Sequence, residues 1–93
     1  METLTRSQIA IMLMMRRGIN LKHLASANSW IDTEYFDAHM NFDCATLLEK
    51  GYLQVRSRIY RDTIYELSKI GKEEASRQQR ITLAQTETIS NLL

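Results

Sequence analysis

The feature that most constrains the fold is a change of hydrophobic period in the second half of the chain. Residues 45–49 continue a helical apolar pattern, and Gly51 supplies the C-terminal stop. The stretch 52–55 then alternates as a strand does, and a second β-rich stretch follows at 64–67. From Ser68, a suitable N-cap, the sequence favours a helix again. The order predicted is helix, strand, turn, strand, helix.

The first helix is predicted to begin at Arg6. Thr5 and Gln8 have the spacing of a capping box, and Gly18 closes the helix after Arg17. Residues 9–15 are entirely apolar, which a helix packed on one side does not need. Either this helix lies centrally, or it also forms part of a subunit interface.

Two further helices are expected between the first helix and the hairpin. A short one would span residues 20–27, and a third would start at Asp32 as its cap and run to Lys50. Asp43 interrupts the apolar stripe of the third helix. The alternatives are therefore one long helix, or one that ends near Asn41 followed by another capped by Asp43.

This order of elements over residues 5–75 resembles the recognition helix, wing and closing helix of the winged helix-turn-helix transcriptional regulators. The resemblance rests on the segments 45–53 and 64–74. It implies a mainly α fold with a small β-hairpin, in which a winged helix-turn-helix domain fills residues 1–75 and a helical extension fills residues 76–93. It also implies double-stranded DNA as the partner, contacted by the wing along the phosphate backbone.

The expected wing is basic. Alternation along its first strand turns Leu53 and Val55 toward the core and three polar side chains outward, namely Gln54, Arg56 and Arg58. Arg61 and Tyr60 lie at the turn, so that three guanidinium groups could hold phosphate oxygens. Alternatively, the arginines only keep an exposed hairpin soluble and blunt its edge. The tip contains neither Gly nor Asn, which departs from usual hairpin turns.

The expected recognition helix is acidic rather than basic. Its candidates for base or phosphate contact are Asn41, which could pair with adenine, and His39. Glu34 and Glu49 on its outward face would repel phosphates. A second hypothesis is therefore a winged-helix protein-interaction module, an inhibitor or adaptor that does not bind DNA.

Composition narrows the class of protein. The chain has 93 residues, enough for one domain, and its net charge of +1 does not by itself favour nucleic acid. The single Cys44 forms no internal disulfide, and no apolar run reaches the ~20 residues that span a bilayer. No secretory signal is evident, so a cytoplasmic location is expected. Neither a metal-ligand cluster nor a nucleophile motif is present, and we expect no enzyme, metal or cofactor.

The C-terminal segment is expected to remain helical past residue 75. Ile81, Ala84, Thr88 and Leu92 share one helical face. A small domain gains little from such a tail unless it packs on a partner, which favours a homodimer through this helix. The alternative is a frayed tail, because several Thr and Ser residues weaken its helix propensity.

Overall fold

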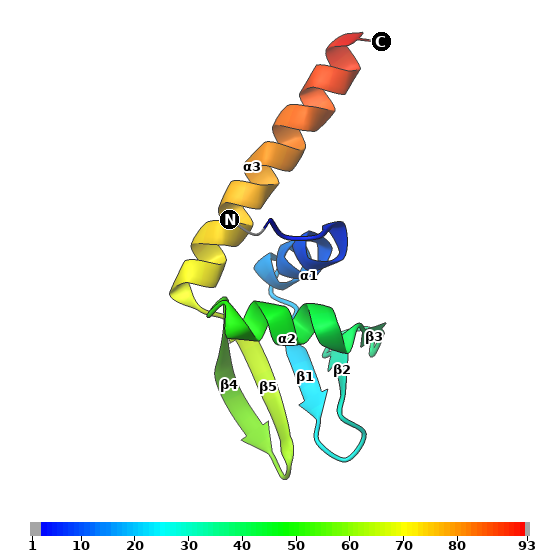
Figure 1. The fold of residues 1–93 in the computed structure, drawn as a ribbon, viewed down its shortest axis with the longest axis vertical. Coiled ribbons are helices and arrows are strands. Elements are labelled where there is room, and N and C mark those ends of the chain that lie inside the picture. Colours follow the sequence, from blue (N-terminus) through cyan, green and yellow to red (C-terminus); the bar gives the residue numbers. More distant parts are fainter. Residues whose placement is uncertain (1–2, 93) are drawn as a thin grey trace.

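The computed structural model describes residues 3–92, with side chains to residue 85. This part of the chain is an α+β domain of three helices and one five-stranded antiparallel sheet, in the order β3-β2-β1-β5-β4 (Figure 1). The elements in chain order are α1 (Arg6–Arg16), β1 (Leu21–Leu24), β2 (Ser29–Asp32), β3 (Ala38–His39), α2 (Asn41–Glu49), β4 (Leu53–Ile59), β5 (Asp62–Leu67) and α3 (Lys69–Leu92).

The prediction of a mainly α winged helix-turn-helix fold is therefore wrong. The short helix expected over residues 20–27 is replaced by β1 and the turn that leads into β2. Spacings of three and four there suggested a helix, but alternate residues face the core: Leu21 pairs with the buried Asp32, and His23 pairs with the buried Trp30. Tertiary pairing with β5 on the other side of β1 completes the sheet.

The third helix is half as long as predicted. Residues 32–39 form a strand end, a loop and β3, and α2 begins only at Asn41. Neither Asp32 nor Asp43 caps it, since its N-cap is Met40, which makes no side-chain cap bond. Asp43 instead lies buried inside the first turn and accepts a hydrogen bond from Gln8 Nε2 at 3.3 Å.

Four local predictions are confirmed. Helix α1 begins at Arg6 under a capping box, in which Gln8 N donates to Thr5 Oγ1 at 3.2 Å and Thr5 N donates to Gln8 Oε1 at 3.0 Å. The hairpin of β4 and β5 forms, and α3 follows Ser68, whose hydroxyl accepts from Gly71 N at 3.1 Å. Helix α3 also continues past residue 75 to Leu92.

The core lies between the sheet and the two shorter helices. Helix α1 contacts α2, α3 and β5, and this central position explains why residues 9–15 are all apolar. Met12, Leu21 and Leu47 are fully buried there and join α1, β1 and α2. Beyond this body α3 extends alone, as Figure 1 shows. None of the helices within residues 3–92 is long and apolar enough to cross a bilayer.

The base of the β4–β5 hairpin is fixed by a close backbone contact. Ser68 N donates to the carbonyl oxygen of Tyr52 at 2.9 Å. A Cβ at Gly71 would overlap that same oxygen, so only glycine fits at this point of α3. The first turn of α3 and the start of β4 are thus pressed together, which sets the direction in which the hairpin leaves the body.

Candidate functional site

The tip of the β4–β5 hairpin is an exposed basic part of the structure. Arg58, Tyr60 and Arg61 are all exposed, and Tyr60 is 101% exposed with a left-handed backbone, φ +57°. The two strands run beyond α2 and end at this tip (Figure 1). Among the ion pairs of the described residues, none includes Arg56, Arg58 or Arg61. Their guanidinium groups therefore face water.

A β-bulge changes which way these side chains point. The register steps from Val55↔Tyr65 to Ser57↔Ile64, so Arg56 has no partner on β5. Beyond the bulge Arg58 pairs with Thr63, on the face of the sheet that carries Trp30. The prediction that Arg56 and Arg58 share one outward face is therefore wrong. Val55, predicted to be in the core, is 47% exposed.

Arg56 lies in a groove with cations from two other elements. The groove is about 480 Å³ in volume and is lined by Arg16 at the end of α1, Arg56 on β4 and Lys72 on α3. Glu66 is the acidic residue in the lining, and Met15 and Leu67 are apolar lining residues. Arg16 Nε also donates to Ser76 Oγ at 3.4 Å. Three cations around one carboxylate make this groove suitable for an anion.

The other two predicted DNA contacts make intramolecular hydrogen bonds. His39 Nε2 lies 3.2 Å from Asp32 Oδ2, and the Asn41 side-chain amide donates to the carbonyl oxygen of Asn28 at 2.7 Å. Both bonds tie neighbouring segments together, which is sufficient reason for their presence. A role in DNA contact stays a prediction for these two residues.

The loop between β2 and β3 is organised by one carboxylate that was expected to cap a helix. Asp32 is 1% exposed, and its Oδ1 accepts from the N–H groups of Glu34, Tyr35 and Phe36 while Oδ2 accepts from that of Asp37. These are the bonds of a helix cap, but Phe36 turns to φ +58° and no helix follows. Nothing in the sequence Asp32-Thr33-Glu34-Tyr35-Phe36 distinguishes such a loop from the start of a helix.

Hydrogen bonding also sets the charge of this carboxyl group. Burial alone would raise the pKa of Asp32, but the hydrogen bonds from Tyr35, His39, Glu34 and Asp37 outweigh it and hold the pKa below its ordinary value of 3.8. Asp32 is therefore a buried anion at neutral pH, fully enclosed by donors.

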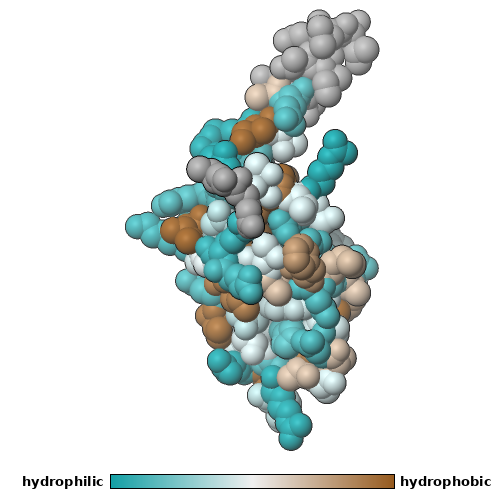
Figure 2. All heavy atoms as spheres, viewed as in Figure 1, coloured by the Kyte–Doolittle hydropathy of each residue, from teal (hydrophilic) through white to brown (hydrophobic). Residues whose placement is uncertain are grey.

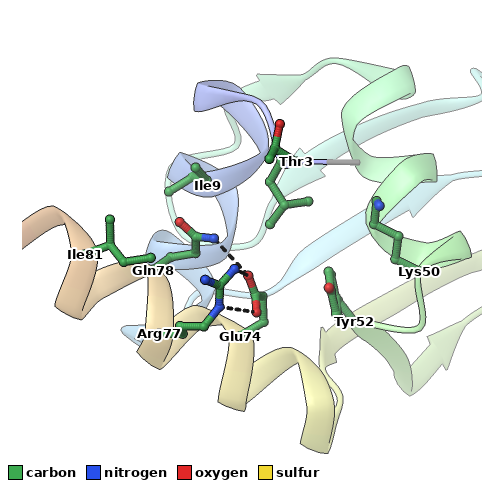
Figure 3. A pocket seen from close by; sticks show the side chains of 9 residues that line it. Thr3, Ile9, Lys50, Tyr52, Glu74, Arg77, Gln78 and Ile81 are labelled. Atoms are coloured by element: carbon green, nitrogen blue, oxygen red, sulfur yellow. Dashed lines mark hydrogen bonds and ion pairs between the residues drawn. The ribbon is translucent and has the colours of Figure 1, made fainter. Parts of the chain in front are cut away.

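A second hollow lies between α1, the end of α2 and α3. It measures about 760 Å³ and contains Lys50, Tyr52 and an acid–base group on α3 (Figure 3). Arg77 donates to Glu74 through two nitrogens, at 2.6 and 2.9 Å, and Gln78 Nε2 donates to the same carboxylate at 2.8 Å. The bond from Arg77 lowers the pKa of Glu74. The polar groups on α3 satisfy one another, which leaves little reason for a ligand.

The buried cysteine and the acidic side chains bear on thiol and metal chemistry. Cys44 is fully buried, and burial raises the pKa of its thiol to about 12. This part of the chain also contains no group of three or more His, Cys, Asp or Glu side chains that could hold a metal ion.

Comparison of the chain with protein-family models, with curated proteins and with solved structures finds no match.

Proposed function

We propose that this chain binds double-stranded DNA through the β4–β5 ribbon, as a small transcriptional regulator. The observation that carries the proposal is the exposed tip, where Arg58 and Arg61 flank Tyr60 at the end of the β4–β5 hairpin, which forms one edge of the five-stranded sheet and extends past the helices. A ribbon of this kind fits a DNA groove, and arginine binds phosphate oxygens in a bidentate manner.

The groove on the side of the ribbon supports the same proposal. Arg56 shares it with Arg16 and Lys72, so the cations of β4 join those at the end of α1 and the start of α3. A duplex backbone that passes the ribbon tip would find further positive charge along this path. The arginines also lie on or next to the edge strand β4, where charged side chains discourage pairing with a further strand. If this is their only role, their removal should not change the affinity for DNA.

Fluorescence anisotropy of a labelled mixed-sequence duplex, titrated at several salt concentrations, tests the proposal. Each phosphate contact removed should make the slope of log K against log salt shallower by about 1. We expect this from Arg58→Ala and from Arg61→Ala. Arg80→Ala, which removes an exposed cation on α3, is the matched control and should leave the slope unchanged. Equal losses in all three variants, or no binding of the wild type at low salt, would refute the proposal.

A protein-interaction module that does not bind DNA is the second candidate. The observation in its favour is a run of large apolar side chains that are exposed on one short segment, at Tyr35, Phe36, Met40 and Phe42. Soluble domains rarely gather such residues without a partner. Absence of DNA binding in the titration would favour this candidate.

The homodimer expected through the C-terminal helix also stays a prediction. Ile81 and Leu83 are 38% and 55% exposed on α3, and the face continued by Thr88 and Leu92 lies outside the described side chains. Sedimentation of the full chain against a shortened chain tests it. The cut belongs after residue 85 rather than after residue 76, because Gln78 is buried against the body.

A further inference from the structure

The segment 35–42 presents four large apolar side chains to solvent. Tyr35, Phe36, Met40 and Phe42 are each between 67% and 72% exposed. The backbone at Tyr35 and Phe36 is well fixed, because the buried carboxylate of Asp32 accepts hydrogen bonds from the N–H groups of residues 34–37. Figure 2 shows that apolar side chains interrupt the polar surface at several separate places on the face in view, so exposure of this kind is a property of more than one region.

The surroundings of this segment are acidic. Glu34 and Asp37 are exposed and flank Tyr35 and Phe36 in the chain. An apolar surface with carboxylates at its border favours a partner whose own apolar residues lie between cations, because like charges that face each other across an interface lower the affinity. The chemistry of the partner is thereby restricted to a basic element with an apolar centre.

The chain carries such an element at the β4–β5 tip. Ile59 is 45% exposed and Tyr60 is fully exposed, and Arg58 and Arg61 stand on either side of them. Phe36 and Tyr60 share a further property: each is an exposed aromatic residue in the left-handed region, at φ +58° and +57°. Each conformation closes a turn of its own chain, since Tyr60 lies in the two-residue turn between Ile59 and Asp62 and Phe36 N donates to Asp32 Oδ1, but neither ring gains burial from it.

The two surfaces cannot meet within one molecule. In the strand order β3-β2-β1-β5-β4, the segment 35–42 adjoins β3 at one edge of the sheet, and the tip belongs to β4 at the opposite edge. A contact between them must join different copies, either reciprocally in a twofold dimer or head to tail along a chain of copies.

We propose that the β4–β5 tip of one copy docks on the segment 35–42 of a second copy, with Tyr60 against the apolar side chains and Arg58 and Arg61 against Glu34 and Asp37. Copies then associate through two unlike surfaces, the tip as donor and the segment 35–42 as acceptor. The contact uses the same tip residues as the proposed DNA binding, so one tip cannot make both at once. The self-association experiment below contains no DNA, however, so the two proposals fail separately.

Two variants block the opposite sides of the contact without disturbing the fold. Phe36→Asn removes the ring from the acceptor surface, and Tyr60→Asn removes it from the donor surface. Asn tolerates a left-handed backbone better than an aromatic residue does, so both variants should fold. The readout is binding of soluble full-length chain to immobilised full-length chain, measured in four combinations by biolayer interferometry.

A contact between two unlike surfaces predicts a specific pattern. Wild type should bind wild type, neither single variant should bind itself, and Phe36→Asn should bind Tyr60→Asn, because that pair retains one intact donor and one intact acceptor. We expect the self-affinity of each single variant to fall at least tenfold. The double variant should bind nothing.

Other patterns overturn the proposal. Equal binding in all combinations, including the double variant, would place self-association elsewhere, for example on α3. Loss with Phe36→Asn but not with Tyr60→Asn would indicate a symmetric contact between two copies of the segment 35–42. If the wild-type chain remained monomeric at millimolar concentration, the proposal would be refuted, and the segment 35–42 would be available only to a different protein.

Discussion

Two turns of one sheet raise an aromatic side chain into solvent on a left-handed backbone, but they are held in different ways. The loop after Asp32 is fixed from inside by a buried carboxylate that accepts four backbone N–H bonds. The β4–β5 turn has no such centre, since the Asp62 carboxylate beside it reaches outward to Ala25 N at 3.0 Å and to Lys22 Nζ at 3.9 Å.

This difference shows which interactions fix the backbone of each exposed surface. The first turn depends on one side chain, whereas the second depends on the strand ladder and on the tight contact at the hairpin base. Changes at Asp32 should therefore disturb the acidic, apolar surface alone. Changes at the base of the hairpin should disturb the basic surface alone.

The largest effect is expected from Asp32→Ala. It leaves four backbone N–H groups without their acceptor and should lower the free energy of unfolding by about 3 kcal/mol. Asp62→Ala is the matched control and should cost about 1 kcal/mol or less, because its carboxylate is partly exposed. Urea denaturation measures both. Similar costs would abolish the contrast between the two turns.

Gly71→Ala tests the hairpin base. The new methyl group would overlap the Tyr52 carbonyl oxygen, and the resulting shift should cost about 2 kcal/mol. Lys72→Ala, one residue further along the same helix and exposed, should change stability by no more than about 0.5 kcal/mol. Amide exchange should show the loss of protection in β4 and β5, with the Asp32 loop unchanged.

Relief of the left-handed backbone should give a gain in stability. Phe36→Asn and Tyr60→Asn should each raise the free energy of unfolding by roughly 0.5–1 kcal/mol, since an exposed ring contributes little packing. Tyr35→Asn is the control, because Tyr35 is also exposed but its φ is not positive. Thermal melts compare the three. Destabilisation by either variant would mean that its ring packs within its own chain.

Acid should weaken the turn after Asp32, with the smallest effect of the four because a protonated carboxyl still accepts some of its hydrogen bonds. The folded pKa of Asp32 lies below its ordinary value of 3.8, so the carboxylate stabilises the fold fully above that value. The contribution is lost as pH falls from there through the lowered folded pKa. Comparison of wild type with Asp32→Asn by urea denaturation from pH 6 to pH 3 measures it, since the variant should lack this part of the pH dependence.

Much of the local structure was predictable from the sequence. Four features are set by neighbouring residues, and each is confirmed: the capping box of Thr5 and Gln8, the helix stop at Gly51, the hairpin that follows it and the N-cap at Ser68. The exposed arginines of the hairpin were also located correctly. The bulge at Arg56 was not, because an extra residue in one strand is determined by its pairing with the other.

Residues 20–39 were assigned wrongly for a physical reason. A stretch with Leu21 and Leu24 satisfies helical spacing and also a strand with one buried face, and only pairing with β5 decides between them. Asp32 was recognised as a residue that accepts backbone N–H bonds, but those bonds close a loop in this fold.

The amino-acid sequence alone therefore determined the start of α1, the end of α2, the start of α3, the hairpin and the charge of its tip, since these depend on residues a few positions apart. The tertiary structure decided that β1, β2 and β3 extend that hairpin into a five-stranded sheet, and that the acidic aromatic segment and the basic tip lie at its two opposite edges. Strand order and burial arise from contacts between distant residues, which no short stretch of sequence encodes.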